Sequence, residues 1–360
     1  MGNIISNLLQ RRSLNGKPVI EQIAPRATIS GGELQIRGHG FSTVGSPPPQ
    51  VRLNGVDAGL TVSSDRLLIA RIPEGAVSCN LVVNNHRESS DGVPIEVGVP
   101  IAENMHPVGN PAIDRDGNIF VTFSGSRGQK VPVGIYKIDP NYNVKAFLSE
   151  VMNPTGLAFD RKGDLFISSR FDGNIYRATP SGEVSTHAEG MGVATGIAFD
   201  GDEFLYVGDR SGTIFKIAPD RQIFVFATLE PSISAYHLAF GPDGYLYVTG
   251  PTTSSFDCIS RISRTGVVEK FYQGVGRPQG MAFDVDGNLY VAASQAGRKG
   301  ILRINQQGQC ELVVSGPGLV GLAFTTGAAI LVTTGAVYHL NMNVRGRPMP
   351  EKTIEKTPGK

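Results

Sequence analysis

The segment Gln279-Gly-Met-Ala-Phe-Asp-Val-Asp-Gly-Asn-Leu-Tyr-Val-Ala292 decides the fold of this chain. An apolar run that ends in Ala-Phe precedes an Asp-Val-Asp-Gly stretch, and a second apolar run follows it. Asp-Gly between two short runs of this kind is typical of a tight hairpin, because glycine accepts the positive φ that such turns require. The segment therefore predicts two antiparallel strands joined by a short turn.

This hairpin pattern recurs along the chain. One anchor residue closes the first strand of each copy, and successive anchors are 46, 40, 41, 43 and 41 residues apart. The anchors are Ile113, Phe159, Phe199, Phe240, Phe283 and Phe324. A period of this length with four short strands in each copy is typical of a β-propeller, in which each repeat forms one blade. We therefore predict six blades over residues 99–343.

The two ends of the repeat region predict how the ring closes. The sixth copy ends after its third strand, near Val337–Leu340, so its outer strand is missing. Upstream, Ala102-Glu-Asn-Met105 matches Ala188-Glu-Gly-Met191, and each Met lies eight residues before an anchor. We therefore expect residues 99–105 to supply the outer strand of the last blade.

Residues 20–98 have a different pattern. Short alternating stretches such as Glu33-Leu-Gln-Ile-Arg37 are separated by turn residues such as Gly31-Gly32 and Asn54-Gly55, which predicts a small β-sandwich. The Ile36-x-Gly-x-Gly-Phe41 and Val51-x-Leu-Asn-Gly55 motifs resemble the IPT/TIG family of immunoglobulin-like domains. The predicted organisation is all-β: a flexible arm over 1–19, this domain over 20–98, the propeller over 99–343 and a disordered tail over 344–360.

The repeat region resembles the six-bladed NHL-repeat propellers and the related gluconolactonase/regucalcin (SMP-30) superfamily. The resemblance implies a lactonase whose cation is held by Glu, Asn and Asp at the starts of the innermost strands. Those positions lie four residues before each anchor and carry no carboxylate here: Gly109, Thr155, Thr195, Tyr236, Gln279 and Val320. Since a hard divalent cation prefers anionic or carbonyl oxygens, we predict no metal site and no cofactor. Calcium or another divalent cation is expected only if the chain is a lactonase.

Composition excludes several partner classes. The formal net charge is +1, which provides no electrostatic footprint for nucleic acid. No apolar run approaches the length of a membrane span, so no membrane span is expected. The N-terminus lacks the order of a signal peptide, and the three cysteines lack the spacing of metal ligands. We therefore expect a cytoplasmic protein.

Charged side chains follow two of the predicted second strands. Arg170 directly follows the second strand of one repeat, which ends at Ser169. Asp209 ends the second strand of the next repeat, and Arg210 directly follows it. Because equivalent strand ends meet on one face of a propeller, we predict a polar site there that binds an anionic or polyhydroxylated ligand. The predicted ligand-binding residues also include Tyr236, Gln279, Thr155 and Thr195, with His237 as a candidate general base. The alternative is that Asp209 and the arginines form structural ion pairs that organise loops.

These patterns favour a binding function. We predict that the propeller recognises a polar or anionic small molecule, or a protein, at the mouth of its channel. One alternative is an enzyme, either a lactone hydrolase acting on a sugar-acid lactone or a metal-free lyase. A second alternative is a purely structural interaction module, because the blade pattern specifies architecture much better than activity.

Overall fold

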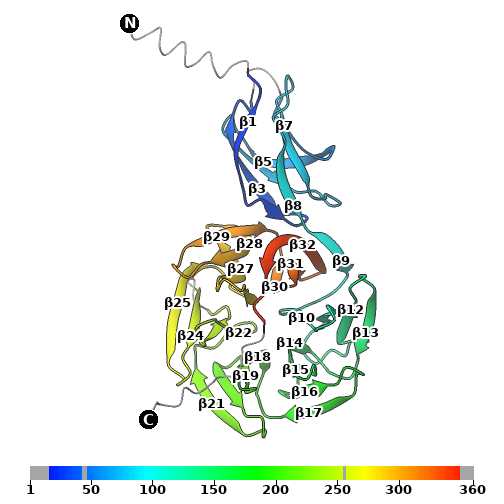
Figure 1. Ribbon diagram of the computed structural model, residues 1–360, viewed down its shortest axis with the longest axis vertical. Helices are drawn as coiled ribbons and strands as arrows, with labels where there is room; N and C mark the ends of the chain where they lie inside the picture. The colour runs from blue at the N-terminus through cyan, green and yellow to red at the C-terminus, as the bar shows by residue number, and fades with distance from the viewer. Residues whose placement is uncertain (1–15, 43–46, 254–256, 349–360) are drawn as a thin grey trace, which may run out of the picture. The chain divides into compact units, whose positions relative to one another are not determined.

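The computed structural model describes residues 16–42, 47–253 and 257–348, and all its regular elements are β-strands (Figure 1). The chain forms two compact units. The first contains residues 1–99 with 298–301 and 312–317, and the second contains residues 100–297, 302–311 and 318–360. The described residues include no helix, and therefore no helix long and apolar enough to cross a membrane.

The first unit is built from antiparallel pairs. β1 pairs with β3, β3 with β6, β6 with β5, β5 with β4, β4 with β7, and β7 with β8. The hairpin between β4 and β5 turns at Asn54 and Gly55, both of which have positive φ. The strands are β1 (Val19–Ala24), β2 (Ala27–Thr28), β3 (Glu33–His39), β4 (Gln50–Leu53), β5 (Val56–Ser63), β6 (Leu67–Arg71), β7 (Cys79–Asn84) and β8 (Val93–Val97).

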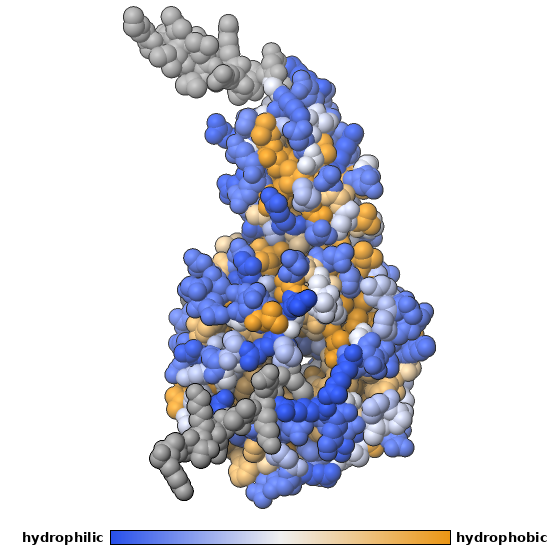
Figure 2. Space-filling view, viewed as in Figure 1, coloured by the Kyte–Doolittle hydropathy of each residue, from blue (hydrophilic) through white to orange (hydrophobic). Residues whose placement is uncertain are grey.

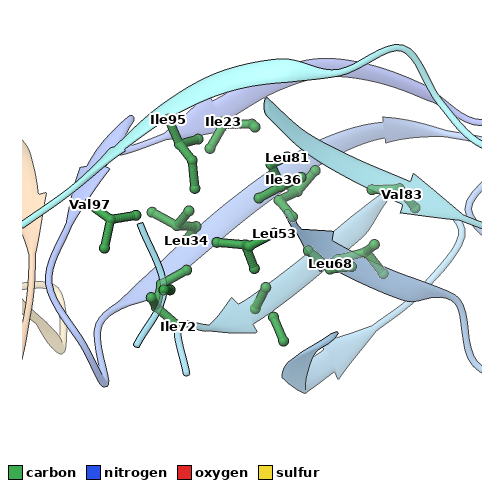
Figure 3. Close-up of a cluster of buried hydrophobic side chains, with 14 of the residues drawn as sticks. Ile23, Leu34, Ile36, Leu53, Leu68, Ile72, Leu81, Val83, Ile95 and Val97 are labelled. Carbon is green, nitrogen blue, oxygen red and sulfur yellow. The ribbon is translucent and has the colours of Figure 1, made fainter. Parts of the chain in front are cut away.

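Alternate residues of these strands form one hydrophobic core. In β3, Leu34 and Ile36 are fully buried while their neighbours Glu33 and Arg37 are exposed. Figure 3 shows these two side chains meeting Leu53, Leu68 and Leu81 between the strands. The period of two in the sequence is therefore the period of burial, as expected for strands with one face on a core.

The second unit contains five four-stranded sheets, which Figure 1 shows arranged around a common centre as in a propeller. In four of them the strands follow chain order from the centre outwards. These strands are β10 (Ala112–Ile113), β11 (Ile119–Thr122), β12 (Ile135–Ile138), β13 (Val144–Leu148); β14 (Pro154–Phe159), β15 (Leu165–Ser169), β16 (Ile175–Ala178), β17 (Val184–Ala188); β18 (Ala194–Phe199), β19 (Leu205–Asp209), β20 (Thr213–Ile217), β21 (Ile223–Thr228); β22 (His237–Phe240), β23 (Leu246–Thr249), β24 (Asp257–Ile262) and β25 (Val268–Val275).

The fifth four-stranded sheet combines distant parts of the chain. β9 (Val99–Glu103) lies beside β32 (Ala336–Arg345), which follows β31 (Thr326–Thr333) and β30 (Leu319–Phe324). The repeat alignment predicted this position for residues 99–105, and the sheet order confirms it. Between the fourth sheet and this one, four further strands are neighbours in chain order within a longer sheet: β26 (Met281–Phe283), β27 (Leu289–Gln295), β28 (Arg298–Ile304) and β29 (Cys310–Ser315).

The anchor aromatics join each sheet to the previous one. Phe199 of β18 meets Phe166 of β15 edge to face, with ring centroids 4.9 Å apart. The same contact joins Phe240 to Tyr206, at 5.1 Å. It also recurs in three further pairs: Phe120 with Phe159, Tyr247 with Phe283, and Tyr290 with Phe324. Edge-to-face packing of this kind adds stability beyond area burial, so the repeat spacing sets the joints between sheets.

The Asp-x-Asp-Gly segments are turns, as their hairpin context predicted. The Asp114 carboxylate accepts hydrogen bonds from the backbone N–H groups of Asp116 and Asn118, at 3.0 and 2.8 Å. Gly117 provides the positive φ that the turn needs. In the equivalent Asp-Arg-Lys-Gly turn, Asp160 accepts in the same way from the N–H groups of Lys162 and Asp164, both at 2.9 Å.

The structure differs from the predicted bounds of the N-terminal arm and the C-terminal tail. Residues 1–15 of the predicted arm and 349–360 of the predicted tail lie outside the described residues. Within the described part, β1 already begins at Val19, and β32 continues through Arg345. Gly346 then bridges to Asp284, so residues 344–346 are ordered rather than part of a disordered tail.

Candidate functional site

A cavity of about 620 Å³ runs along the axis of the propeller unit. The first strand of every repeat contributes to its wall, from Gly109 and Thr155 near the strand starts to Phe159 and Phe240 at the anchors. Its other end is bordered by the hairpin turns at Asp114 and Asp160, and by Arg347 and Pro348. The volume lies within the range of small-molecule sites in proteins.

The side chain of Asn110, in the first repeat, forms hydrogen bonds with the last two repeats. Its Nδ2 donates to the carbonyl of Met281 at 2.8 Å, and its Oδ1 accepts from the N–H of Leu322 at 3.1 Å. A Cβ on either Gly280 or Gly321 would collide with Asn110, so glycine at those two positions makes room for it. Asn110 therefore connects the ends of the ring at the level of the strand starts.

We expect Asn110→Ala to destabilise the propeller unit by about 2 kcal/mol, because it leaves the N–H of Leu322 and the carbonyl of Met281 without their partner. Urea unfolding followed by tyrosine fluorescence measures this. Asn110→Asp keeps the acceptor and loses the donor, so it is expected to fall between wild type and Asn110→Ala. Equal stability of Asn110→Ala and wild type would contradict the bridging role.

His237 faces the axial cavity. Only 5% of it is exposed, and its ring forms no hydrogen bond with any described residue. Its position, three residues before an anchor, is occupied by glycine in four other repeats. Burial lowers the pKa of His237 to about 4, because the protonated imidazole would lose its hydration. The side chain is thus a neutral imidazole at neutral pH, able to donate one hydrogen bond and accept another.

The other residues predicted at the strand starts use their polar atoms within the protein. The Thr195 hydroxyl donates to the carbonyl of Gly208 at 2.8 Å and accepts from the N–H of Tyr236 at 3.1 Å. The Tyr236 hydroxyl donates to the carbonyl of Glu230, and burial raises its pKa to about 12. Thr155 and Tyr236 border the cavity together with His237, whereas Thr195 and Gln279 do not.

Arg170, Asp209 and Arg210 do not border the cavity. They lie at the ends of the second strands, where Arg170 donates through Nη2 to the carbonyl of Gly125. The Arg170 Nε is buried and has no hydrogen-bond partner, and the same holds for Ser124 Oγ beside Gly125. Burial, and then the nearby charges of Arg210 and Arg127, lower the pKa of Arg170. We call Ser124, Arg127, Arg170 and Arg210 the arginine cluster.

Within the described residues, no carboxylate forms an ion pair with an arginine of this cluster. Asp209, 7% exposed, instead accepts a hydrogen bond from the N–H of Val193 at 2.8 Å and another from Ser211. The ion pairs considered as an alternative are therefore absent from this part of the chain. Asp209 organises its own loop, and the arginines keep donors available.

The donor set at the strand starts does not suit a divalent cation. The hydroxyls of Thr195 and Tyr236 are already hydrogen-bonded to backbone groups, and Thr155 donates to the carbonyl of Asn153 at 3.3 Å. The described residues contain no group of three or more His, Cys, Asp or Glu side chains that could hold a metal ion. A cation that needs six or more oxygen ligands would find no anionic one at these positions.

Sequence reasoning missed three members of these sites. Asn110 was detectable, because the position three residues before the anchor is glycine in four repeats and the exceptions are Asn110 and His237. Ser124 was also detectable, because it lies eleven residues after its anchor, as Arg170 and Arg210 do. Arg127 gave no such signal, since it lies further into the segment between β11 and β12, which is longer than its counterparts in the second and third repeats.

Comparison of this chain with known proteins shows a similarity of fold only. No family model matches the chain, and no curated protein matches its sequence. A gluconolactonase from Xanthomonas campestris is similar in structure, with a TM-score of 0.58 and 16% identity over 82% of this chain and 95% of its own. The fold is a β-propeller. Identity this low shows nothing about a shared activity.

Two further solved structures are also similar in fold. Virginiamycin B lyase from Staphylococcus aureus, solved with quinupristin as an inactive variant, has a TM-score of 0.51 and 16% identity, covering 82% of this chain and 99% of its own. An auxiliary nutrient binding protein from Bacteroides thetaiotaomicron has a TM-score of 0.52 and 12% identity, covering 91% of this chain and 98% of its own.

Proposed function

We propose that this protein is a binding propeller whose arginine cluster recognises the carboxylate or phosphate group of a small polar molecule, such as a sugar acid. The observation that carries the proposal is the buried Nε of Arg170, which has no partner and lies close to the unpartnered Ser124 Oγ. Burying a polar group without a partner is costly. An anion would be held by charge-assisted hydrogen bonds from the guanidinium groups of the cluster, which can bind such anions in a bidentate manner.

We also propose that the propeller has six blades and that the first unit is an IPT/TIG-type module. Six blades account for the run β26–β29, because Phe283 and Phe324 join it to its neighbours by the contact found between the other sheets. The resemblance of the repeats to NHL propellers supports the same count. The antiparallel pairs, the single core and the Asn54-Gly55 turn of the first unit support an IPT/TIG-type module over residues 20–98.

The comparisons include a hydrolase, a lyase and a binding protein. Similarity to a gluconolactonase favours the lactone hydrolase alternative, whereas similarity to a nutrient binding protein over 91% of this chain favours binding. The donor set favours binding over a cation-dependent hydrolase. Because the strand-start hydroxyls are engaged with backbone groups, a calcium-dependent lactonase centre is not supported, and binding through arginines is.

Calorimetry tests the proposal with gluconate, glucose 6-phosphate and inorganic phosphate as probes, and glucose as the uncharged control. We expect at least one anion to bind and glucose not to bind. Arg170→Ala is expected to weaken anion binding about 10–100-fold, the loss of one charge-assisted hydrogen bond.

The control variant is Lys145→Ala, which removes the same charge from the exposed outer strand β13 and is expected to bind like wild type. All variants are compared by melting temperature. The proposal fails if no anion binds, or if Arg170→Ala binds the anions as tightly as wild type does.

A further inference from the structure

The axial cavity is a second candidate site, separate from the arginine cluster. None of Arg127, Arg170 and Arg210 borders it. Figure 2 shows a small opening near the centre of the propeller unit. Because the cavity follows the inner strand β14 from Thr155 to Phe159, it extends over at least about 13 Å at the rise of a β-strand, and it continues into the turns beyond. An elongated molecule matches this form better than a compact one.

Between its two polar ends, the wall of the cavity is mainly apolar. The residue before each anchor is alanine in all six repeats, and Ala158, Ala239 and Ala282 are partly exposed to this space. Leu157, Met281 and Leu322 complete the wall between them. A ligand with an apolar body would bury its surface against this wall, which is the main favourable contribution to binding in such pockets.

One polar group is directed into the inner end of the cavity. The His237 imidazole is 5% exposed and forms no hydrogen bond with the described residues. Its neighbour across the axis, Gly109, has no side chain to pair with it, and an added Cβ there would lie 3.8 Å from the His237 Nδ1. A hydroxyl or carbonyl on a ligand would supply the missing partner.

The other end of the cavity is basic. Arg115, Arg161 and Arg347 border it, together with Asp114 and Asp160. The two carboxylates already accept hydrogen bonds from the backbone of their own turns. In the described residues no ion pair engages Arg115 or Arg347. The charge at this end therefore favours an acidic group on the ligand.

We propose that the axial cavity binds an elongated amphiphilic acid, with its anionic group at Arg115 and Arg347, its apolar body along the alanines, and a hydrogen-bonding group at His237. The anionic group, the apolar body and the hydrogen-bonding group of the ligand would each contact a different region of the cavity wall. Only the anionic group of the ligand would lie at the end of the propeller opposite the arginine cluster, but no arginine of that cluster borders the cavity, so the proposal stands or fails independently of the arginine cluster.

Calorimetry on the full chain tests the proposal with 12-hydroxydodecanoate, dodecanoate and 1-dodecanol below their aggregation concentrations. We expect saturable binding of 12-hydroxydodecanoate at one site per chain. Dodecanoate should bind several-fold more weakly, because it lacks the group that meets His237. The alcohol should bind at least tenfold more weakly than dodecanoate, because it lacks the charge.

Three variants locate the site. Ala282→Phe fills the cavity and should abolish binding, Arg347→Ala should weaken both acids about tenfold, and His237→Phe should remove the preference for the hydroxylated acid. Lys145→Ala, which loses a charge on an outer strand, should bind like wild type, and the melting temperature of each variant verifies folding. Absence of saturable binding, undiminished binding by a folded Ala282→Phe, or equal binding of the alcohol overturns the proposal.

Discussion

Ala102→Asp is expected to destabilise the propeller unit by about 3–5 kcal/mol, the cost of burying a charge that has no partner. Ala102 lies on β9 and is 7% exposed, packed in a cluster with Met105, Ile330 and Val332. β9 lies beside β32, so this cluster holds together two parts of the chain more than 200 residues apart. A whole domain has only about 5–15 kcal/mol of stability, so the loss is large.

Tyrosine fluorescence measures this effect selectively. All ten tyrosines lie between residues 136 and 338, within the second unit, and the chain has no tryptophan. Urea unfolding followed at the tyrosine emission therefore reports on the propeller. The control is Glu103→Ala on the same strand, where the side chain is exposed and the expected change is below 0.5 kcal/mol. If Ala102→Asp unfolds at the same urea concentration as this control, β9 does not close the ring.

The repeat positions predicted the fold because each performs a local task that recurs. The anchors Phe199, Phe240 and Phe283 lie where two sheets meet, and Asp114 and Asp160 lie where a turn needs an acceptor. Such requirements act within one repeat or between neighbours, so their spacing is visible in the sequence. The closing strand was visible for the same reason, since Ala102 and Met105 retain the pattern of a blade that is otherwise completed elsewhere.

The candidate site could be predicted only in part, because side-chain direction at the strand starts depends on local irregularities. The register shifts between Pro154 and Leu157, and again between Ala194 and Ile197. A shift of one residue changes which side chains face the axis. The hydroxyls of Thr155 and Thr195 thus bond to backbone carbonyls, whereas His237, on the regular strand β22, faces the cavity.

The arginine cluster was predictable only from its strand-end members. Arg170 and Arg210 follow equivalent strands, and their spacing indicated that they share a face. Ser124 lies at the same repeat position, eleven residues after its anchor, but its residue type gave no reason to single it out, and Arg127 lies in the longer part of that segment, where no period placed it. The absence of an ion pair to Asp209 also depended on the loop backbone, because the N–H of Val193 uses that carboxylate.

Lowering the pH from 7 to 4 is expected to remove up to about 3 kcal/mol of stability through His237 alone. Burial holds the pKa of His237 at about 4 in the folded protein, against 6.5 for the exposed imidazole. Between these values the unfolded chain binds the proton and the folded protein does not, so acidification favours unfolding. The contribution of His237 to stability is complete above pH 6.5 and is lost as the pH falls towards 4.

His187 and His339 also have lowered pKa values, so wild type alone does not isolate His237. The measurement is therefore the difference in unfolding free energy between wild type and His237→Gln, from urea unfolding across this pH range. Wild type should lose more stability than the variant, and parallel curves would mean that the imidazole is protonated in the folded protein and is not buried as described.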